Sequence, residues 1–256
     1  MAQIARVIAF SIFKGGTGKT TSSVNVAAAL AEQGKRVLLV DLDQQASATK
    51  YVGVDPDQAR ASAYQSFTQN APLSLAVHQT NFDFDLIPSH ELMSAVEAMM
   101  ESGKDETLLR DKLDPLLPEY DFVLIDTPPG KAMLTFNAIV AADQIIIPVS
   151  AERMAIDGLA DLVKHLHSVL WRRFSDLDQD LRILFTMYKA GTSHSPGIVR
   201  EARKIYRDNV LPMHVPEAIA FPRSFESQQP ITSYSPTHQG AHAYRDLAKW
   251  LLNEKS

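Results

Sequence analysis

A run of small, basic and hydroxyl residues near the start of this 256-residue chain has the composition of a phosphate-binding loop. It consists of Lys14, Gly15, Gly16, Thr17, Gly18, Lys19, Thr20 and Thr21. Backbone N–H groups of such a glycine-rich turn converge on phosphate oxygens, and the N-terminus of a following helix favours anions. Lys19 can reach the β- and γ-phosphates, and the Thr20 hydroxyl can ligate Mg²⁺. The run therefore predicts a site for a nucleoside triphosphate.

The start of this loop departs from the usual pattern G-x-x-x-x-G-K-[ST]. Phe13 stands where the first glycine is expected, and Lys14 follows it. Two lysines then crowd one ligand, which is unfavourable unless the second cation meets a negative charge. Lys14 could be an accidental surface lysine, or it could serve the phosphates bound by a partner subunit.

Two further apolar segments end in carboxylates. Residues 36–43 read Arg-Val-Leu-Leu-Val-Asp-Leu-Asp, and residues 121–126 read Asp-Phe-Val-Leu-Ile-Asp. Such runs are typical of parallel strands that are covered on both faces and whose carboxyl ends meet at a ligand crevice. Asp41 or Asp126 alone could merely cap the next helix. Together with a phosphate-binding loop, both are expected at the nucleotide.

These residues require a scaffold, and the pattern of the chain predicts one. Apolar strands alternate with amphipathic helices, which indicates an α/β fold with a mostly parallel, twisted sheet flanked by helices on both faces, in one domain spanning 1–256. Gly34 is expected to end the first helix, and Ser195 to cap a helix that begins at Pro196. Segment 46–79 is the least patterned, and we expect a loop and a short helix there. We expect strands at 4–11, 36–41, 84–88, 121–126, 144–149, 181–187 and 211–215, and helices at 19–33, 91–101, 105–116, 132–141, 156–173, 196–208 and 240–253.

Composition excludes several classes of protein. The chain has no cysteine, which removes disulfides, thiolate zinc sites and iron–sulfur clusters. It has no apolar stretch of about 18 residues, and residues 1–13 lack the form of a signal peptide, so a cytoplasmic location is expected. His165 and His167 are two apart on a predicted helix and face different ways. Mg²⁺ is therefore the metal we expect.

The loop from Lys14 to Thr21 resembles the deviant Walker A motif of the ParA/MinD family of P-loop ATPases, in its ParA (Soj-like) branch. Further similarity extends through the segments after residue 134 and those around Pro216, Phe221 and Gly240, which leaves 46–79 as the exception. The resemblance implies a P-loop NTPase fold, ATP and Mg²⁺ as cofactors, and a homodimer that forms with ATP. It also implies that Lys14 reaches the nucleotide of the other subunit.

The resemblance also implies roles for other residues. Segment 41–45 is similar to the family's DxDxQ segment, in which Asp41 would orient the attacking water, although Gln44 replaces the usual proline. Asp126 matches the Walker B acid that holds Mg²⁺ together with Thr20, and residues 127–130 match the switch that senses the γ-phosphate. In relatives the loop after the last strand lies against the base, which makes Pro216, Glu217 and Ala218 candidates for adenine contacts.

A basic stripe could bind DNA. Arg200, Arg203, Lys204 and Arg207 fall at i, i+3, i+4 and i+7, which is one face of a predicted helix. The stripe could be a solvated face without a ligand, and the net charge of −5 gives DNA no support. The resemblance favours DNA, because ParA-type relatives bind it without sequence preference as ATP dimers. Residues that could extend the stripe are Arg223, Lys189, Arg172 and Arg173.

Two other functions share these motifs. A MinD-like regulator would bind a membrane through a C-terminal amphipathic helix, and Leu247, Trp250 and Leu251 could form its apolar stripe. Acidic residues interrupt that segment, so we expect a helix docked on the core and no membrane binding. A ligase or kinase of the dethiobiotin-synthetase type would need a substrate pocket beside the γ-phosphate. The expectation is a nucleoid-associated ATPase switch that positions a plasmid, chromosome or protein complex, with an adaptor that stimulates hydrolysis.

Overall fold

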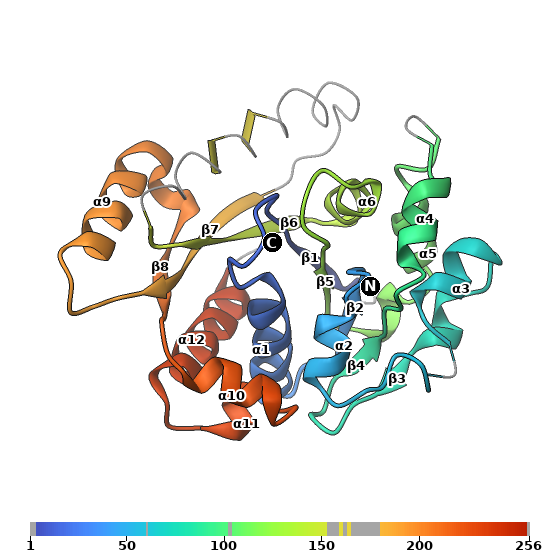
Figure 1. Cartoon of the computed structure of the whole chain (residues 1–256), viewed down its shortest axis with the longest axis horizontal. Helices are drawn as coiled ribbons and strands as arrows, with labels where there is room; N and C mark the ends of the chain where they lie inside the picture. The colour runs from blue at the N-terminus through green and yellow to red at the C-terminus, as the bar shows by residue number, and fades with distance from the viewer. Residues whose placement is uncertain are drawn as a thin grey trace.

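A single sheet of eight strands organises the computed structural model, which describes residues 4–59, 61–101, 104–152, 159–160, 163–164 and 180–254 (Figure 1). The strand order is β3-β4-β2-β5-β1-β6-β7-β8, and neighbouring strands are parallel except for the pair β3 and β4. The strands are β1 (Arg6–Phe10), β2 (Val37–Asp41), β3 (His78–Gln79), β4 (Asp85–Ile87), β5 (Phe122–Asp126), β6 (Gln144–Ser150), β7 (Asp180–Tyr188) and β8 (Val210–Pro216).

Helices cover both faces of this sheet. The described helices are α1 (Lys19–Ala31), α2 (Ser47–Tyr51), α3 (Ala63–Thr68), α4 (Met93–Met99), α5 (Leu108–Leu113), α6 (Met133–Ala141), α9 (His194–Tyr206), α10 (Ala220–Glu226), α11 (Ile231–Tyr234) and α12 (Gln239–Asn253). Short 3₁₀ turns occupy Leu73–Ala76, Leu117–Glu119 and Arg207–Asn209. Figure 1 shows α1 and α12 side by side, and the many contacts between them agree.

The alternation of side chains along the central strands divides the core. On β1, Ile8 and Phe10 pack with α1 and α12, whereas Val7 and Ala9 pack with the cluster that includes α4, α5 and α6. Successive residues of a strand point to opposite faces, so an apolar run such as 37–40 serves both layers. Beside them, β6, β7 and α9 form a third apolar cluster. This burial fixes the strands whose carboxyl ends form the site.

The predicted elements agree with the structure at the sheet and differ at the periphery. Each predicted strand is present, and the bounds differ by up to two residues. The helices predicted for 91–101 and 105–116 are shorter, at 93–99 and 108–113, and α10, α11 and β3 were not predicted. The short helix expected within 46–79 had no predicted bounds, and the structure has two helices there, α2 and α3. The helix predicted for 156–173 lies outside the described residues apart from 159–160 and 163–164, which are helical.

Two predicted helix ends can be compared directly. Gly34, just past α1, has a φ of +73°, a conformation that favours glycine and fits the expected end of the helix. The prediction of Ser195 as a cap was wrong, because α9 begins at His194 and follows Ser193. The Ser195 hydroxyl is buried and donates to the Ala151 carbonyl instead. No described helix is long and apolar enough to cross a membrane.

Candidate nucleotide site at the carboxyl ends of the strands

The glycine-rich loop connects β1 to α1, as the sequence predicts. Gly16 and Gly18 have φ values of +73° and +87°, which other residues adopt with strain, and Gly18 directly precedes α1. Strand β7 braces the loop, because the Thr186 hydroxyl donates to the Thr17 carbonyl at 2.8 Å. The Thr186 methyl group would lie 3.6 Å from a Cβ at Gly18. The loop is therefore held in a turn that leads directly into the N-terminus of α1.

This loop forms one side of a hollow of about 290 Å³, which we call the phosphate hollow. Asp43, from the segment after β2, and Pro129, from the segment after β5, lie on its other sides. The complete lining is Gly15, Gly16, Gly18, Lys19, Thr20, Thr21, Asp43, Ser47, Tyr51, Pro129 and Phe225. Thr17 is buried beside it and braces the loop through its carbonyl. The segments that follow β1, β2, β5 and β8 thus converge on one concave surface.

Lys14 differs from Lys19 in its surroundings. Lys14 is exposed, and it makes no hydrogen bond or ion pair among the residues that the structure describes. Lys19 is 7% exposed, and burial lowers its pKa, which the neighbouring charges of Asp126 and Asp43 oppose. The loop therefore presents one cation inward, to the hollow, and one outward, to solvent.

Asp126 has the donor chemistry of a metal site. It is fully buried at the end of β5, and neither carboxylate oxygen has a hydrogen-bond partner of normal geometry. Burial raises the pKa of Asp126 well above its usual range, and the neighbouring charge of Asp41 adds to this, while the Thr20 hydroxyl and Lys19 oppose it. A buried carboxylate without a partner is unfavourable alone, and it suits a hard cation such as Mg²⁺. Asp126 and Thr20 therefore fit the predicted Mg²⁺ site.

Asp41, expected to orient the attacking water, has different surroundings from Asp43. Asp41 is fully buried and accepts three hydrogen bonds, from the Asp43 N–H at 3.0 Å, the Thr49 N–H at 2.9 Å and the Thr49 hydroxyl at 2.7 Å. Burial raises its pKa to about 6, although the bonds from Thr49 oppose the shift. The Asp41 carboxylate is therefore bonded to the segment that follows it, and Asp43, not Asp41, lines the phosphate hollow.

A second hollow, of about 820 Å³, adjoins the first, and we call it the base hollow. The two share Gly18, Thr21 and Phe225. The predicted base contacts all lie in its lining, which is Gly18, Thr21, Thr186, Met187, Val215, Pro216, Glu217, Ala218, Ile219, Phe221, Pro222, Phe225, Glu226 and Tyr244. Together the two hollows have the polar and apolar parts that a nucleotide needs.

Sequence reasoning missed the contribution of β7 to this site. Met187 lines the base hollow with a φ of +50°, where β7 and β8 lose their regular register between Phe185 and Tyr188. Backbone strain of this kind concentrates at functional sites. The available signal was a strand predicted for 181–187 whose carboxyl end, like those of the other parallel strands, must lie at the ligand crevice.

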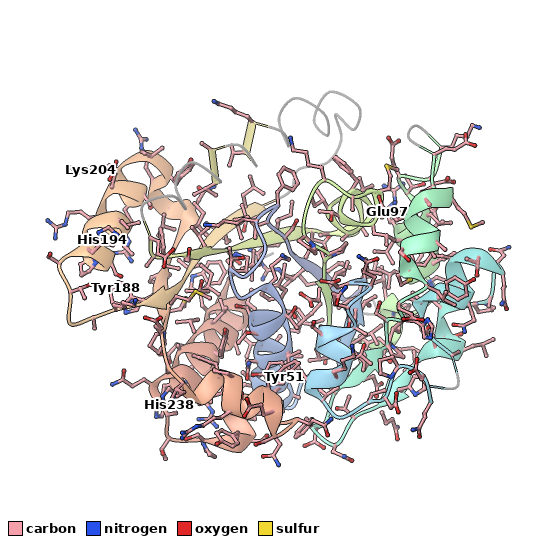
Figure 2. All side chains as sticks on the ribbon, viewed as in Figure 1. Tyr51, Glu97, Tyr188, His194, Lys204 and His238 are labelled. Carbon is pink, nitrogen blue, oxygen red and sulfur yellow. The ribbon has the colours of Figure 1, made fainter. Side chains whose placement is uncertain are left out.

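The structure brings together only part of the predicted DNA-binding set. Arg200, Arg203 and Lys204 are exposed on α9, whose outer side carries Lys204 in Figure 2. Arg207 is exposed, but α9 ends before it, and its φ of +47° turns the chain away from the helix. The Arg203 guanidinium lies 3.5 Å from the carbonyl oxygens of Leu211 and Pro212 on β8. Only part of the stripe is therefore one continuous helix face.

The other proposed cations are elsewhere or already paired. Arg223 is exposed on α10, the helix beside the base hollow, not on α9. Lys189 forms an ion pair of 2.9 Å with Glu217, and both side chains are about half exposed. Arg172 and Arg173, like His165 and His167, lie outside the described residues.

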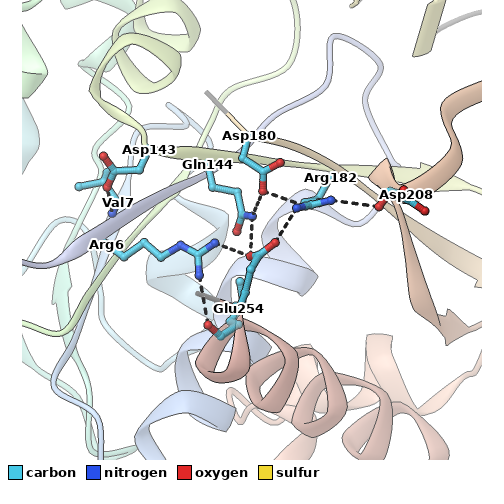
Figure 3. A network of polar contacts seen from close by, with 9 residues as sticks. Arg6, Val7, Asp143, Gln144, Asp180, Arg182, Asp208 and Glu254 are labelled. Atoms are coloured by element: carbon cyan, nitrogen blue, oxygen red, sulfur yellow. Dashed lines mark hydrogen bonds and ion pairs between the residues drawn. The ribbon is translucent and has the colours of Figure 1, made fainter. Parts of the chain in front are cut away.

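The C-terminal helix is docked on the core. Leu247 and Leu251 on α12 are buried, and the Arg182 guanidinium lies 5.1 Å from the centre of the Trp250 ring. Arg6 and Arg182 both pair with Glu254, just past the helix (Figure 3). The apolar stripe that could have met a membrane therefore packs against the protein.

Comparison with known proteins identifies the family. A family model described as an AAA domain matches residues 5–183. The sporulation initiation inhibitor protein Soj of Bacillus subtilis is 34% identical over 248 residues, which cover 96% of this chain and 98% of that protein. The chromosome-partitioning ATPase Soj of Thermus thermophilus is 38% identical, with 96% and 95% covered. The chain belongs to the ParA/Soj family of P-loop ATPases.

A solved structure is similar over the same length. It is named cobyrinic acid a,c-diamide synthase from Mycobacterium smegmatis, with bound ATP analogue and magnesium. It is 32% identical, covers 97% of this chain and 95% of its own, and has a TM-score of 0.80. This ParA/Soj-family protein is an ATPase, and ATP and Mg²⁺ are its cofactors.

Proposed function

We propose that this ParA/Soj-family ATPase is an ATP-driven dimerisation switch that binds DNA without sequence preference and positions a cargo. The observation that carries this proposal is the position of Lys14, an exposed lysine beside the phosphate hollow without a partner among the described residues. A cation so placed can neutralise phosphate charge only on a ligand that extends beyond its own hollow. The nucleotide of a second subunit is such a ligand.

Several residues in and beside the phosphate hollow have a proposed part in this cycle. The N–H groups of Gly15, Gly16 and Gly18 and the ammonium group of Lys19 bind the phosphates, while Thr20 and Asp126 hold Mg²⁺. Mg²⁺, when bound, neutralises charge that develops on the phosphate oxygens. Lys14 of each subunit reaches the phosphates of the other, as an arginine finger does in other NTPases.

Asp43 is the carboxylate that we assign to the attacking water. It lines the phosphate hollow, whereas Asp41 bonds to Asp43 and Thr49 and so holds this loop in place. A carboxylate that orients water must reach the space beside the γ-phosphate. Pro216, Glu217 and Ala218, with Met187, would contact the base.

The DNA surface would come from α9. Arg200 and Lys204 are exposed and make no ion pair among the described residues, and a dimer doubles their number. Arg203 and Arg207 would contribute from beside them, and Arg223 would contribute from α10. Contacts of this type bind backbone phosphate and read no bases. An adaptor on the cargo would stimulate hydrolysis. Hydrolysis would then separate the dimer, and the subunits would leave the nucleoid for the cytoplasm.

The in-trans role of Lys14 is tested by dimerisation. In an Asp43→Ala background, which should retain ATP, we expect the wild-type loop to form dimers with ATP and the additional Lys14→Ala variant to remain monomeric in analytical ultracentrifugation. ATP affinity should change by less than about threefold, because Lys19 keeps the phosphates of its own subunit. Lys249→Ala is the control for loss of one exposed lysine. Equal dimerisation of both proteins would overturn the role of Lys14.

DNA binding is tested on nonspecific duplex DNA with ATP, ADP and no nucleotide. Binding should require ATP, and its affinity should fall steeply as salt rises, as counterion release dictates. Arg200→Glu with Lys204→Glu should abolish it and leave ATP hydrolysis unchanged. The control is Lys104→Glu with Arg110→Glu, at and beside α5, which makes the same charge change on the opposite side of the molecule (Figure 1). This variant should bind DNA as the wild type does. If neither pair alters affinity, α9 is not the DNA surface.

A second candidate function follows from the name of the Mycobacterium smegmatis structure, an amide-forming synthase. An enzyme of that class turns over ATP in proportion to a carboxylic acid substrate and a nitrogen donor. It has no need of an exposed lysine at the loop. ATP turnover that depends on added carboxylic acid and ammonia, and that Lys14→Ala leaves intact, would favour this function over the switch.

A further inference from the structure

Helix α6 begins three residues after the segment 127–130, and the chain gives it no local cap. The residue before the helix is Ala132, whose side chain cannot accept a hydrogen bond, and the first turn contains no acidic residue. The first N–H groups of a helix have no partner within the helix and require an external acceptor. The start of α6 therefore depends on another part of the fold.

Glu97, on α4, supplies that acceptor. One oxygen of its carboxylate accepts a hydrogen bond from the Met133 N–H, and the other accepts from the Leu134 N–H at 2.9 Å. Figure 2 shows Glu97 between α4 and α6. A negative charge at this end of a helix also interacts favourably with the helix dipole. Among the described residues Glu97 makes no ion pair, so this helix end is the positive group that its carboxylate meets.

A second polar link joins α6 to α5 one turn later. Asn137 is fully buried, its side-chain oxygen accepts from the Leu109 N–H at 2.9 Å, and its nitrogen donates to the Asp105 carbonyl at 2.8 Å. Helix α6 is thus bonded to α4 through Glu97 and to α5 through Asn137. A displacement at the start of α6 would be transmitted to both helices.

The same segment is bonded to the end of β1 and to the residue that precedes the phosphate-binding loop. The Gly130 N–H donates to the Phe13 carbonyl at 3.0 Å, and the Thr127 hydroxyl donates to the Phe10 carbonyl at 2.8 Å. The Lys131 ammonium group lies 5.4 Å from the centre of the Phe13 ring. Segment 127–132 therefore spans from the loop that binds phosphate to the helix end that Glu97 caps.

We propose that Glu97 is a positioning residue that couples segment 127–130 to α4, beside the link that Asn137 makes to α5, so that the presence of a γ-phosphate changes the outer faces of these two helices. Leu92 and Met99, at the two ends of α4, are exposed at 43% and 66% and would report this change to any partner. The inference rests on the proposed role of segment 127–130 in sensing the γ-phosphate. It adds a route by which that signal leaves the site.

Amide hydrogen exchange of the full chain tests the coupling, with Mg²⁺ and either ADP or a non-hydrolysable ATP analogue. In the wild type, exchange of peptides within 127–141 and within 93–113 should differ between the two nucleotides. In Glu97→Ala the difference should remain at 127–141 and at 105–113, where Asn137 still links α6 to α5, and it should disappear from 93–101. The kcat for ATP hydrolysis should fall by about fivefold, which is the change in rate that corresponds to the free energy of a lost helix cap. The KM should not change, because Glu97 does not touch the nucleotide.

Two variants keep the result specific. Glu101→Ala, which removes an exposed carboxylate four residues further on, should behave as the wild type does. Glu97→Gln retains the side-chain volume and one acceptor, so it should show an intermediate effect, and it replaces Glu97→Ala if that variant unfolds. Exchange at 93–101 that responds equally in the wild type and the Glu97 variants would overturn the coupling. If the wild type responds at 127–141 but not at 93–101, the coupling alone is overturned. If it does not respond at 127–141 either, the sensing role is overturned as well.

Discussion

The two ends of the sheet differ in whether their charged side chains have partners. At the carboxyl end, Asp126 closes β5 with no hydrogen-bond partner for either oxygen, and Lys19 lies buried nearby. At the amino end, Arg6 opens β1 and Arg182 lies near the start of β7, and both pair with Glu254 (Figure 3). Gln144 and Asp180 complete the amino-end network.

The difference separates a binding site from a structural contact. A buried charge without a partner lowers stability, and it is retained where a ligand supplies the missing charge. A buried charge whose partners are present fixes the position of the elements that carry it. The carboxyl end therefore marks the nucleotide, and the amino end fastens the terminus of α12 to the sheet. Substitutions at the two ends should have opposite effects on stability and activity.

The largest expected effect is on ATP hydrolysis at the carboxyl end. Asp126→Asn removes the unpartnered charge, so Mg²⁺-dependent hydrolysis should fall by roughly 100-fold or more, because the metal loses its protein carboxylate. The same change should raise the melting temperature of the nucleotide-free protein at pH 8, since a buried unpaired charge is removed. Steady-state ATPase assays and thermal unfolding measure the two effects.

The control for Asp126→Asn is Asp143→Asn, at the amino end. The Asp143 carboxylate already accepts a hydrogen bond from the Val7 N–H at 2.7 Å, so this variant should gain no stability and should keep its activity. If Asp126→Asn keeps more than about a tenth of the wild-type ATPase activity, Asp126 is not the carboxylate that holds Mg²⁺.

The amino end should show the reverse pattern. Glu254→Ala leaves Arg6 and Arg182 without their shared carboxylate, and the paired side chains are only 16–20% exposed. We expect a loss of about 2 kcal/mol in the free energy of unfolding, measured in urea, because one partner of a largely buried ion pair is removed. ATP hydrolysis at 25 °C should not change. Glu254→Gln, which keeps an acceptor, should lose less, and equal losses would show that charge rather than hydrogen bonding dominates.

The pH dependence of stability should identify the carboxyl end as well. Burial raises the folded-state pKa of Asp41 to about 6 from its usual 3.8, so between these values the folded protein binds more protons than the unfolded chain. Stability without nucleotide therefore falls as pH rises from about 4 to 6, by at most about 1.4 kcal/mol per pH unit from this group. Urea unfolding at pH 5, 6 and 7 should show a smaller decline for Asp41→Asn. The exposed Asp57→Asn is the control, and parallel declines in all three proteins would contradict the assignment to Asp41.

The sheet and the phosphate-binding loop could be predicted from sequence because their signals are local. Apolar runs such as 37–40 have one stable place in a parallel sheet, and a glycine-rich loop before a helix has few other uses. The choice between Asp41 and Asp43 could not be made in this way. Both acids lie at the end of the same strand, and which of them faces the hollow depends on hydrogen bonds from Thr49, a residue of a short helix that the sequence could not place.

The surface elements were predicted less well for a related reason. Arg207 has the spacing of the α9 stripe, but a φ of +47° there ends the helix, which helical periodicity cannot reveal. Helices α2, α3, α10 and α11 have at most seven residues, and tertiary contacts rather than propensity stabilise such short helices. The cap that Glu97 provides to α6 joins residues 36 and 37 positions apart, a separation that helix and strand periodicity cannot reveal.

The smallest effect is expected for an ion pair that resembles the amino-end contact in chemistry but not in burial. Lys104 and Glu101 form an ion pair in which the side chains are 71% and 64% exposed. Glu101→Gln should change the free energy of unfolding by less than about 0.5 kcal/mol, because solvent screens the charges and ordering two flexible side chains opposes their attraction. Urea unfolding at low salt and at 0.5 M salt, about threefold above physiological ionic strength, should give the same difference within error. A loss comparable to that of Glu254→Ala would mean that ion pairing alone, and not burial at the end of the sheet, stabilises the amino-end network.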